Sequence, residues 1–209
     1  MTEQDFFHYL LNAWFLLAGL MFVLLFFVSA PYGRHLRRGW GLMLNPKLGW
    51  VIMESPAVLG FLAVYLLGRN RYEAVPLVLG GLWQFHYIYR TFVFPTRLRT
   101  QGKRMALAVV AMGFFFNCLN AYVIARWISH LGRYQTDWLR DPRFITGTLV
   151  FLAGFAINYQ ADRMLIALRP PGETGYRVPR GWLYEYVACP NYLGGIVEWF
   201  GFALATWSL

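Results

Sequence analysis

Glu54 is the only charged residue in the apolar run from Leu48 to Gly68. An ionised carboxylate inside a membrane is costly unless it is protonated or paired, so an acidic residue in such a run indicates a functional site. The aromatic and basic residues around the run favour chemistry at this position. The alternative is a structural pair between Glu54 and a side chain of a neighbouring helix.

A second set of polar residues lies between Ala156 and Trp199. Asn158 and Asp162 are four residues apart, which places them on one face of a helix, and Arg169 follows two turns later. The guanidinium group of arginine binds phosphate through paired hydrogen bonds, whereas Asn and Asp can bind an adenine edge or a ribose hydroxyl. The pattern fits a site for a small anionic cofactor, and it equally fits an amphipathic loop that contacts lipid headgroups.

The elements that carry these residues are expected to cross a membrane. Of the 209 residues, 58% are hydrophobic and only 14% are charged, compared with about 25% charged residues in soluble domains. Six apolar runs approach the roughly 17 to 25 residues that a spanning helix needs, and they lack the alternating pattern of a barrel. They cover residues 6–33, 48–68, 74–89, 105–125, 144–161 and 192–209.

These runs predict an all-α polytopic membrane protein with six transmembrane helices. No repeat or low-complexity linker divides the chain, so residues 1–209 are expected to form a single domain. The last run ends at Leu209 without a charged flank. We therefore expect the domain to be incomplete at this end and to continue beyond Leu209.

Positive charges are distributed unevenly between the connecting segments. Thirteen of the 19 Lys and Arg residues fall in the first, third and fifth connections. The positive-inside rule places these connections in the cytoplasm and the N-terminus on the opposite side. Lipid headgroups account for the formal charge of +9, and because no nucleic-acid-binding signature accompanies it, we expect the bilayer as a partner and no nucleic acid.

Motifs for metals and for soluble nucleotide-binding folds are absent from the sequence. Cys118 and Cys189 have neither the spacing of a metal site nor a disulfide framework. The four histidines form no HExxH motif, and neither GxGxxG nor a P-loop occurs. We therefore expect no metal ion and no dinucleotide fold of the soluble type.

At its C-terminal end the chain resembles the signature of the steroid 5-alpha-reductase family, with the sequence RPPGETGYRVPRGWLYEYVACPNYLGGIVEWFGFALATWS. Shorter blocks that resemble family motifs follow in the family's order. They are APYGRH (30–35), WVIMESPA (50–57), FHYIYRTFVFP (85–95), TDWLRDPRF (136–144) and INYQAD (157–162). The resemblance therefore covers nearly the whole chain.

This resemblance implies an NADPH-dependent reductase that saturates the 4,5 double bond of a 3-oxo-4-ene steroid. The family has a seven-helix fold that holds the cofactor from the cytoplasmic side, so a seventh helix is expected beyond Leu209. The compact length of the chain indicates a bacterial homologue, for which the location would be the inner membrane.

The resemblance assigns the substrate ketone to Glu54, in the WVIMESPA block, and to Tyr87, in the FHYIYRTFVFP block. Addition of hydride to an enone moves negative charge onto the carbonyl oxygen, and two donors at that oxygen stabilise the enolate as it forms. A glutamate that stays protonated in an apolar pocket can be one donor, and Tyr87 is the second. For Tyr87 alone, an aromatic residue at the membrane interface is the other interpretation.

A set of cofactor-binding residues also follows from the resemblance. They are Asn158, Asp162, Arg169, Tyr176, Arg177 and Asn191, with Tyr32, Trp50 and Lys103 as further candidates. Arg169 and Arg177 would bind phosphates, and Lys103 the 2'-phosphate that distinguishes NADPH from NADH.

Two positions depart from the family pattern. Met53 stands where the family has glutamine, which removes a polar partner next to Glu54. Gly195 stands where the family has glutamate, which removes one cofactor contact. Glu198 matches a family glutamate, and we expect it to form a structural pair at a helix end.

The reductase is expected to receive an apolar steroid, or a related enone lipid, laterally from the bilayer, and a monomer is favoured. One alternative is a membrane methyltransferase that uses S-adenosylmethionine. Another is a non-catalytic sterol-binding membrane protein, for which Glu54 and Arg177 would be expendable.

Overall fold

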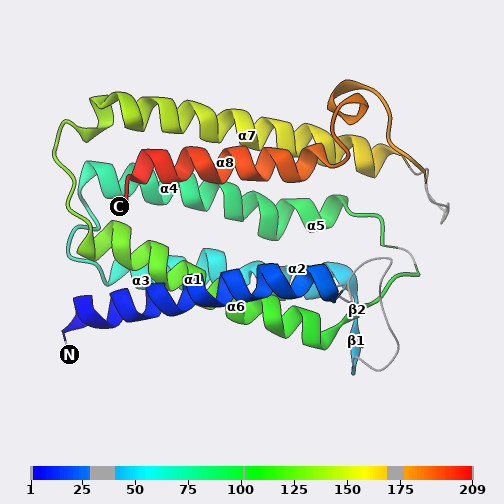
Figure 1. Ribbon diagram of the computed structural model, residues 1–209, viewed down its shortest axis with the longest axis horizontal. Coiled ribbons are helices and arrows are strands. Elements are labelled where there is room, and N and C mark those ends of the chain that lie inside the picture. Colours follow the sequence, from blue (N-terminus) through cyan, green and yellow to red (C-terminus); the bar gives the residue numbers. More distant parts are fainter. Residues whose placement is uncertain (1, 29–40, 101, 169–176, 209) are drawn as a thin grey trace.

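The computed structural model describes residues 2–28, 41–100, 102–168 and 177–208, which form a bundle of helices along one common axis (Figure 1). The helices are α1 (Glu3–Phe27), α2 (Pro46–Ser55), α3 (Phe61–Leu66), α4 (Ala74–Ile88), α5 (Phe94–Arg97), α6 (Leu107–Arg126), α7 (Pro142–Ala167) and α8 (Pro190–Thr206). The strands are β1 (Met43–Leu44) and β2 (Met105–Ala106). Single turns of π-helix cover Pro56–Gly60, Tyr89–Val93 and Trp127–Leu131, and 3-10 turns cover Trp138–Arg140 and Trp182–Glu185.

Within the described residues, four helical segments are long and apolar enough to cross a membrane: Glu3–Phe27, Pro46–Leu66, Leu107–Leu131 and Pro142–Ala167. This confirms the predicted class, an all-α polytopic membrane protein. The two other expected spans correspond to α4 with α5 and to α8, which lie alongside the longer helices (Figure 1). The count of six transmembrane helices stays a prediction.

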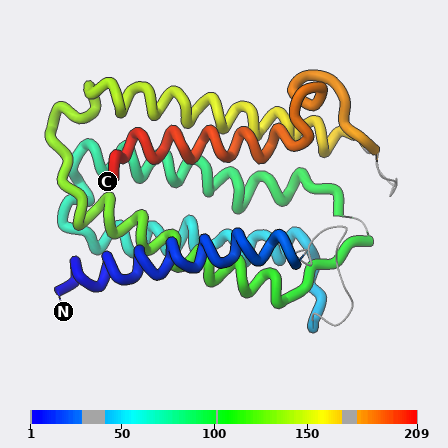
Figure 2. The backbone as a smooth tube through the Cα atoms, viewed as in Figure 1, coloured from blue at the N-terminus to red at the C-terminus, as the bar shows by residue number. Residues whose placement is uncertain are grey.

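Connecting segments alternate between the two ends of the bundle, as the charge pattern requires. The N-terminus and residues 67–73 and 132–141 lie at one end, whereas the paired strands and residues 177–189 lie at the other (Figure 2). The strands are antiparallel, and Met43 is opposite Ala106. Which end faces the cytoplasm stays a prediction.

Arg90 lies within a helical segment, although the sequence placed it in a connection. The helix that begins at Ala74 continues through the π-helical turn into α5 and ends at Arg97, instead of near Tyr89. The positive charge does not end the helix because Arg90 forms an ion pair with Asp162 inside the bundle. An intramembrane charge that is paired in this way is tolerated.

Helices α7 and α8 pack closely because glycines line their contact. Gly154 lies directly against the backbone of Glu198, and Gly194 lies against the backbone of Asn158, so a Cβ atom at either glycine would clash. Small residues let helix backbones approach in membranes. The close approach fixes the positions of Asn158 and Glu198 relative to the facing helix.

Trp83 fixes α4 in the core of the bundle. It is 1% exposed, and its indole N–H donates to the carbonyl oxygen of Ala57 over 2.8 Å. Its ring stacks on Phe61 with centroids 5.1 Å apart and also contacts the rings of Tyr87 and Trp199. These contacts orient the face of α4 that carries Tyr87.

Candidate active site

Glu54 and Tyr87 line the same pocket, which has a volume of about 260 Å³. This volume is close to the lower bound of about 300 Å³ for small-molecule sites. The lining comes from α2, from α6 and from the segment that includes α4, and it comprises Met53, Glu54, His86, Tyr87, Arg90, Gly113, Phe116 and Asn117. The pocket thus brings together the two residues that sequence analysis assigned to the substrate ketone.

Asn117, from α6, holds the Glu54 side chain. Its amide nitrogen donates to Glu54 Oε2 over 3.2 Å and to the carbonyl oxygen of Met53 over 2.9 Å. Asn117 is buried, with 5% of its surface exposed. Its amide gives Glu54 the polar partner that the methionine at position 53 cannot provide. Sequence analysis missed Asn117, although an amide inside an apolar run is a detectable signal.

Tyr87 lies between aromatic rings of α4 and α8. It is 7% exposed, and its ring centroid is 4.5 Å from Trp83 and 5.6 Å from Trp199. Its hydroxyl interacts with the side chain of Asn120 from α6. Tyr87 therefore belongs to the core of the bundle, and the interpretation as a residue of the membrane interface is wrong for this chain.

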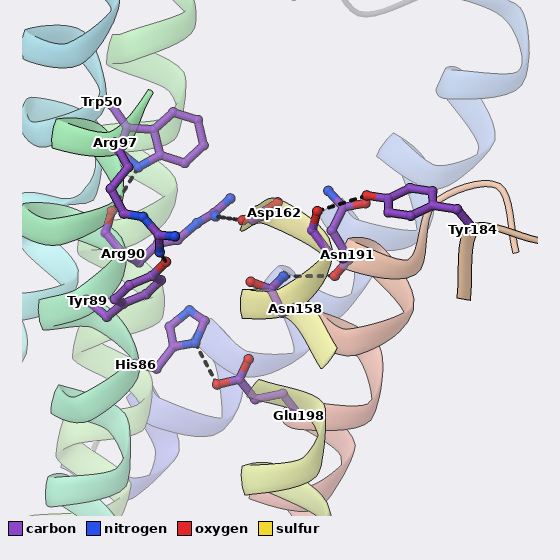
Figure 3. Close-up of polar contacts among 11 residues, drawn as sticks. Trp50, His86, Tyr89, Arg90, Arg97, Asn158, Asp162, Tyr184, Asn191 and Glu198 are labelled. Carbon is purple, nitrogen blue, oxygen red and sulfur yellow. Dashed lines mark hydrogen bonds and ion pairs between the residues drawn. The ribbon is translucent and has the colours of Figure 1, made fainter. Parts of the chain in front are cut away.

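Arg90 joins this pocket to the second polar region. Its Nη1 lies 3.1 Å from Asp162 Oδ2 (Figure 3). Its guanidinium lies over the rings of Trp50 and Phe94. The indole N–H of Trp50 in turn donates to the carbonyl oxygen of Arg90 over 3.0 Å. Two of the predicted cofactor residues, Trp50 and Asp162, are thus held by one arginine that sequence analysis had counted among the loop charges.

Asn158 and Asp162 both interact with Asn191 at the start of α8, which agrees with the single helical face that their spacing predicted. The side-chain amide of Asn158 donates to the carbonyl oxygen of Asn191 over 2.8 Å (Figure 3), and the Asn191 side chain hydrogen-bonds Asp162. Tyr184, in the segment before α8, donates its hydroxyl to the carbonyl oxygen of Ala161 over 3.1 Å. Burial raises the pKa of the Tyr184 hydroxyl to about 12.

Arg97 and two tyrosines extend this network, and sequence analysis did not single them out. Arg97 Nη1 donates to the hydroxyl of Tyr89 over 2.7 Å, and its guanidinium lies 4.8 Å from the ring centroid of Tyr159. The two tyrosines keep the guanidinium of Arg97 at the side of α7 that carries Asp162. The positive charge of Arg97 therefore acts on the Asp162 carboxyl group.

The remaining predicted cofactor residues divide into two groups. Lys103 and Arg177 are exposed, and the segments that carry them lie at the same end of the bundle as the strands (Figure 1). Tyr32, Arg169 and Tyr176 lie outside the described residues. Their roles stay predictions from the sequence.

Glu198 does not form a pair at a helix end, contrary to expectation. It lies in the middle of α8, is completely buried, and its Oε1 is 2.7 Å from Nδ1 of His86 (Figure 3). The pair is interior because the glycine contacts bring α8 close to α7 and direct Glu198 toward α4. Its partner His86 was considered in the sequence only as a metal ligand.

Comparison with known proteins places this membrane-embedded site in a class. Residues 103–209 match the sequence profile described as 3-oxo-5-alpha-steroid 4-dehydrogenase. The chain is 41% identical to steroid 5-alpha-reductase DET2 of Gossypium hirsutum, over 99% of this chain and 82% of that protein. It is also 41% identical to 3-oxo-5-alpha-steroid 4-dehydrogenase 1 of Bos taurus, over 90% of this chain and 74% of that protein.

The chain therefore belongs to the steroid 5-alpha-reductase family, as the sequence motifs indicated. Membership confirms the predicted enzyme class, an oxidoreductase that acts on CH–CH groups, in a family that uses a nicotinamide cofactor. It disfavours both the methyltransferase and the non-catalytic sterol-binding protein. A bacterial origin and a monomeric state stay predictions.

Proposed function

We propose that the protein reduces the 4,5 double bond of 3-oxo-4-ene steroids with NADPH. One observation carries this proposal: Glu54 and Tyr87 come from different helices and line one pocket inside an apolar bundle. The relatives named as steroid 5-alpha-reductases support the steroid as substrate.

Glu54 and Tyr87 would bind the ketone oxygen of the substrate as a pair of hydrogen-bond donors. The nicotinamide cofactor supplies the hydride for the β-carbon of the enone. As negative charge develops on the ketone oxygen, preorganised donors stabilise it more strongly than they stabilise the neutral ketone. Asn117 keeps the carboxyl of Glu54 in place, and the rings of Trp83 and Trp199 keep Tyr87 in place.

The polar side chains of Arg90, Asn158, Asp162 and Asn191 beside the pocket provide the hydrogen-bond donors and the acceptor that a dinucleotide needs. Arg90, Asn158 and Asn191 offer donors, and the Asp162 carboxylate can accept from a ribose hydroxyl. A Cβ atom at Gly195 would meet nothing closer than the Asn158 amide at 4.0 Å, so there is open space beside that amide. We propose that these residues hold the cofactor, with Trp50 contacting it through its ring.

Basic residues that the family motifs assign to the cofactor would bind the phosphates; of these, Lys103 and Arg177 are exposed at the same end of the bundle as the strands. In this proposal Arg177 and Arg169 bind the diphosphate, and Lys103 binds the 2'-phosphate, because guanidinium and ammonium groups pair with phosphate oxygens. Tyr32 and Tyr176 would complete this part of the site. The same end would face the cytoplasm, which contains NADPH.

We propose that the substrate enters the pocket laterally from the bilayer. Phe116, which lines the pocket, contacts Trp14 of α1 with ring centroids 5.1 Å apart. Helix α1 otherwise has little buried surface, so a modest displacement of α1 from α6 would open the pocket to lipid. An apolar steroid that partitions into the membrane needs no aqueous route.

The test uses the detergent-solubilised full chain with a 3-oxo-4-ene steroid and either NADPH, NADH or S-adenosylmethionine. Mass spectrometry of the steroid should show the gain of two hydrogens with NADPH, much less with NADH, and no methylation. Glu73→Gln serves as a control because Glu73 is an exposed carboxylate outside the pocket. Steroid that binds but stays unsaturated with both nicotinamide cofactors would contradict the proposal.

A further inference from the structure

The buried pair of Glu198 and His86 is not needed to bind the ketone, yet it reaches the same pocket. Glu198 is 0% exposed, and the His86 side chain is 11% exposed. Glu198 Oε1 lies 2.7 Å from His86 Nδ1, while Glu198 Oε2 is buried without a hydrogen-bond partner among the residues that the structure describes. A carboxylate with an unsatisfied oxygen in the apolar interior is costly and calls for an explanation.

The two net-neutral forms of this pair carry the same protons. If Glu198 is protonated, it donates to Nδ1, and the neutral imidazole of His86 carries its proton on Nε2. If Glu198 is ionised, His86 is an imidazolium with protons on both nitrogens. In both of these forms Nε2 of His86 carries a proton and can donate it.

The residue that carries this donor, His86, lines the substrate pocket together with Glu54 and Tyr87. Its ring lies edge-on to Tyr87 and Trp199, with both centroid distances 4.8 Å, which fixes its orientation. In Figure 3 the ring lies between Glu198 on one side and Tyr89 with Arg90 on the other. Nε2 is therefore on the side of the ring away from Glu198.

We propose that His86 is a further catalytic residue, which protonates the α-carbon of the enolate and thereby completes the reduction. This inference rests on the proposed function. Glu54 and Tyr87 hold the enolate oxygen, so a separate donor is required for the carbon two bonds away. Glu198 orients the imidazole through Nδ1, as the acidic member of a catalytic triad orients its histidine.

The step balances as a single proton transfer. The Nε2–H bond of His86 breaks, and the electron pair of the enolate C=C bond forms a C–H bond at the α-carbon. The carbonyl double bond is restored, and the saturated ketone leaves its two donors. The pair of Glu198 and His86 then has one proton and a net negative charge until water returns a proton to Nε2.

Two measurements on the detergent-solubilised protein test this role. In the first, His86→Gln should lower turnover about 10²- to 10⁴-fold, the range for removal of a general acid. In the second, the protein is incubated in D2O with the saturated 3-ketosteroid and the oxidised nicotinamide cofactor. By microscopic reversibility the wild type should exchange the α-hydrogens of the ketone for deuterium, and His86→Gln should lose this exchange while it still binds the ketone.

Glu198→Gln provides a second variant that keeps the shape of the side chain. It should reduce turnover and exchange in the same proportion, because a glutamine cannot share a proton with Nδ1. His130→Gln, which changes a histidine at the opposite end of the bundle, should leave both unchanged. Wild type that fails to reduce the steroid would contradict the proposed function itself.

Other outcomes contradict the role of His86 alone. A wild type that reduces the steroid, together with a His86→Gln variant of unchanged turnover, would overturn it. Reduced turnover with undiminished α-exchange would also overturn it and would leave His86 a structural residue. If His86→Gln does not fold, the Glu198→Gln variant provides the test. Deuterium exchange at the wild-type rate in that variant would contradict the proposal.

Discussion

Two Arg–Asp ion pairs differ in their surroundings, because one lies inside the bundle and the other at its surface. Arg90 and Asp162 lie 3.1 Å apart, come from different helices and have side chains that are 24% and 7% exposed. Arg143 and Asp141 lie 2.8 Å apart, are two residues apart in the chain, and lie at the surface where Asp141 caps α7. Only the first pair touches the pocket of Glu54 and Tyr87.

The comparison shows that neither a short ion pair nor a large hollow identifies the site. The end with Asp141 and Arg143 contains a hollow of about 670 Å³, more than twice the volume of the pocket at Glu54. It is lined by surface turns and carries none of the residues that the family motifs assign to chemistry. Buried polar groups that converge from separate helices are the better indicator.

Breaking the interior pair should have the largest effect on stability. Arg90→Met leaves the Asp162 carboxylate buried without its guanidinium, and loss of one partner of a buried pair costs about 3 to 5 kcal/mol. The free energy of unfolding, measured by chemical denaturation in detergent, should fall by about this amount. The double variant Arg90→Met with Asp162→Leu should regain much of it, and a single variant as stable as wild type would contradict a buried pair.

An exposed arginine at the same end as the strands should affect cofactor binding. Arg177→Ala should weaken NADPH binding by about 1.5 to 3 kcal/mol, the range for hydrogen bonds to charged groups. Isothermal titration with NADPH checks this value, and Arg180→Ala is a matched control from the same segment. An unchanged affinity for NADPH in Arg177→Ala would contradict this role and favour a contact between Arg177 and lipid headgroups.

The surface pair should have the smallest effect, visible only in acid. Hydrogen bonds from Arg143 hold the pKa of Asp141 at about 2, below its ordinary value of 3.8. A lowered pKa stabilises the folded state above the unfolded pKa, and this contribution is lost as pH falls from about 4 to 2. Asp141→Asn should flatten the stability profile in that window and match wild type at low pH. Identical acid profiles would show that the pair contributes nothing.

The sequence predicted those site residues that can be recognised from their neighbours in the chain. Glu54 was recognisable because it is alone in an apolar run, and Asn158 and Asp162 because their spacing puts them on one helical face. Arg90 was missed because it follows the apolar run directly and because its partner is 72 residues away. The same holds for His86, whose partner Glu198 is 112 residues away and is positioned only by the packing of α7 against α8.

Glu54 and Tyr87 should act on the same oxygen, which a double-mutant cycle of turnover tests directly. Glu54→Gln and Tyr87→Phe should each lower turnover more than they change the Michaelis constant, with about 10²- to 10³-fold for the loss of one donor. Because both donors serve one developing charge, the double variant should lose less than the product of the two single losses. Wild-type turnover in Glu54→Gln, or two losses that multiply in full, would contradict a shared site for the ketone.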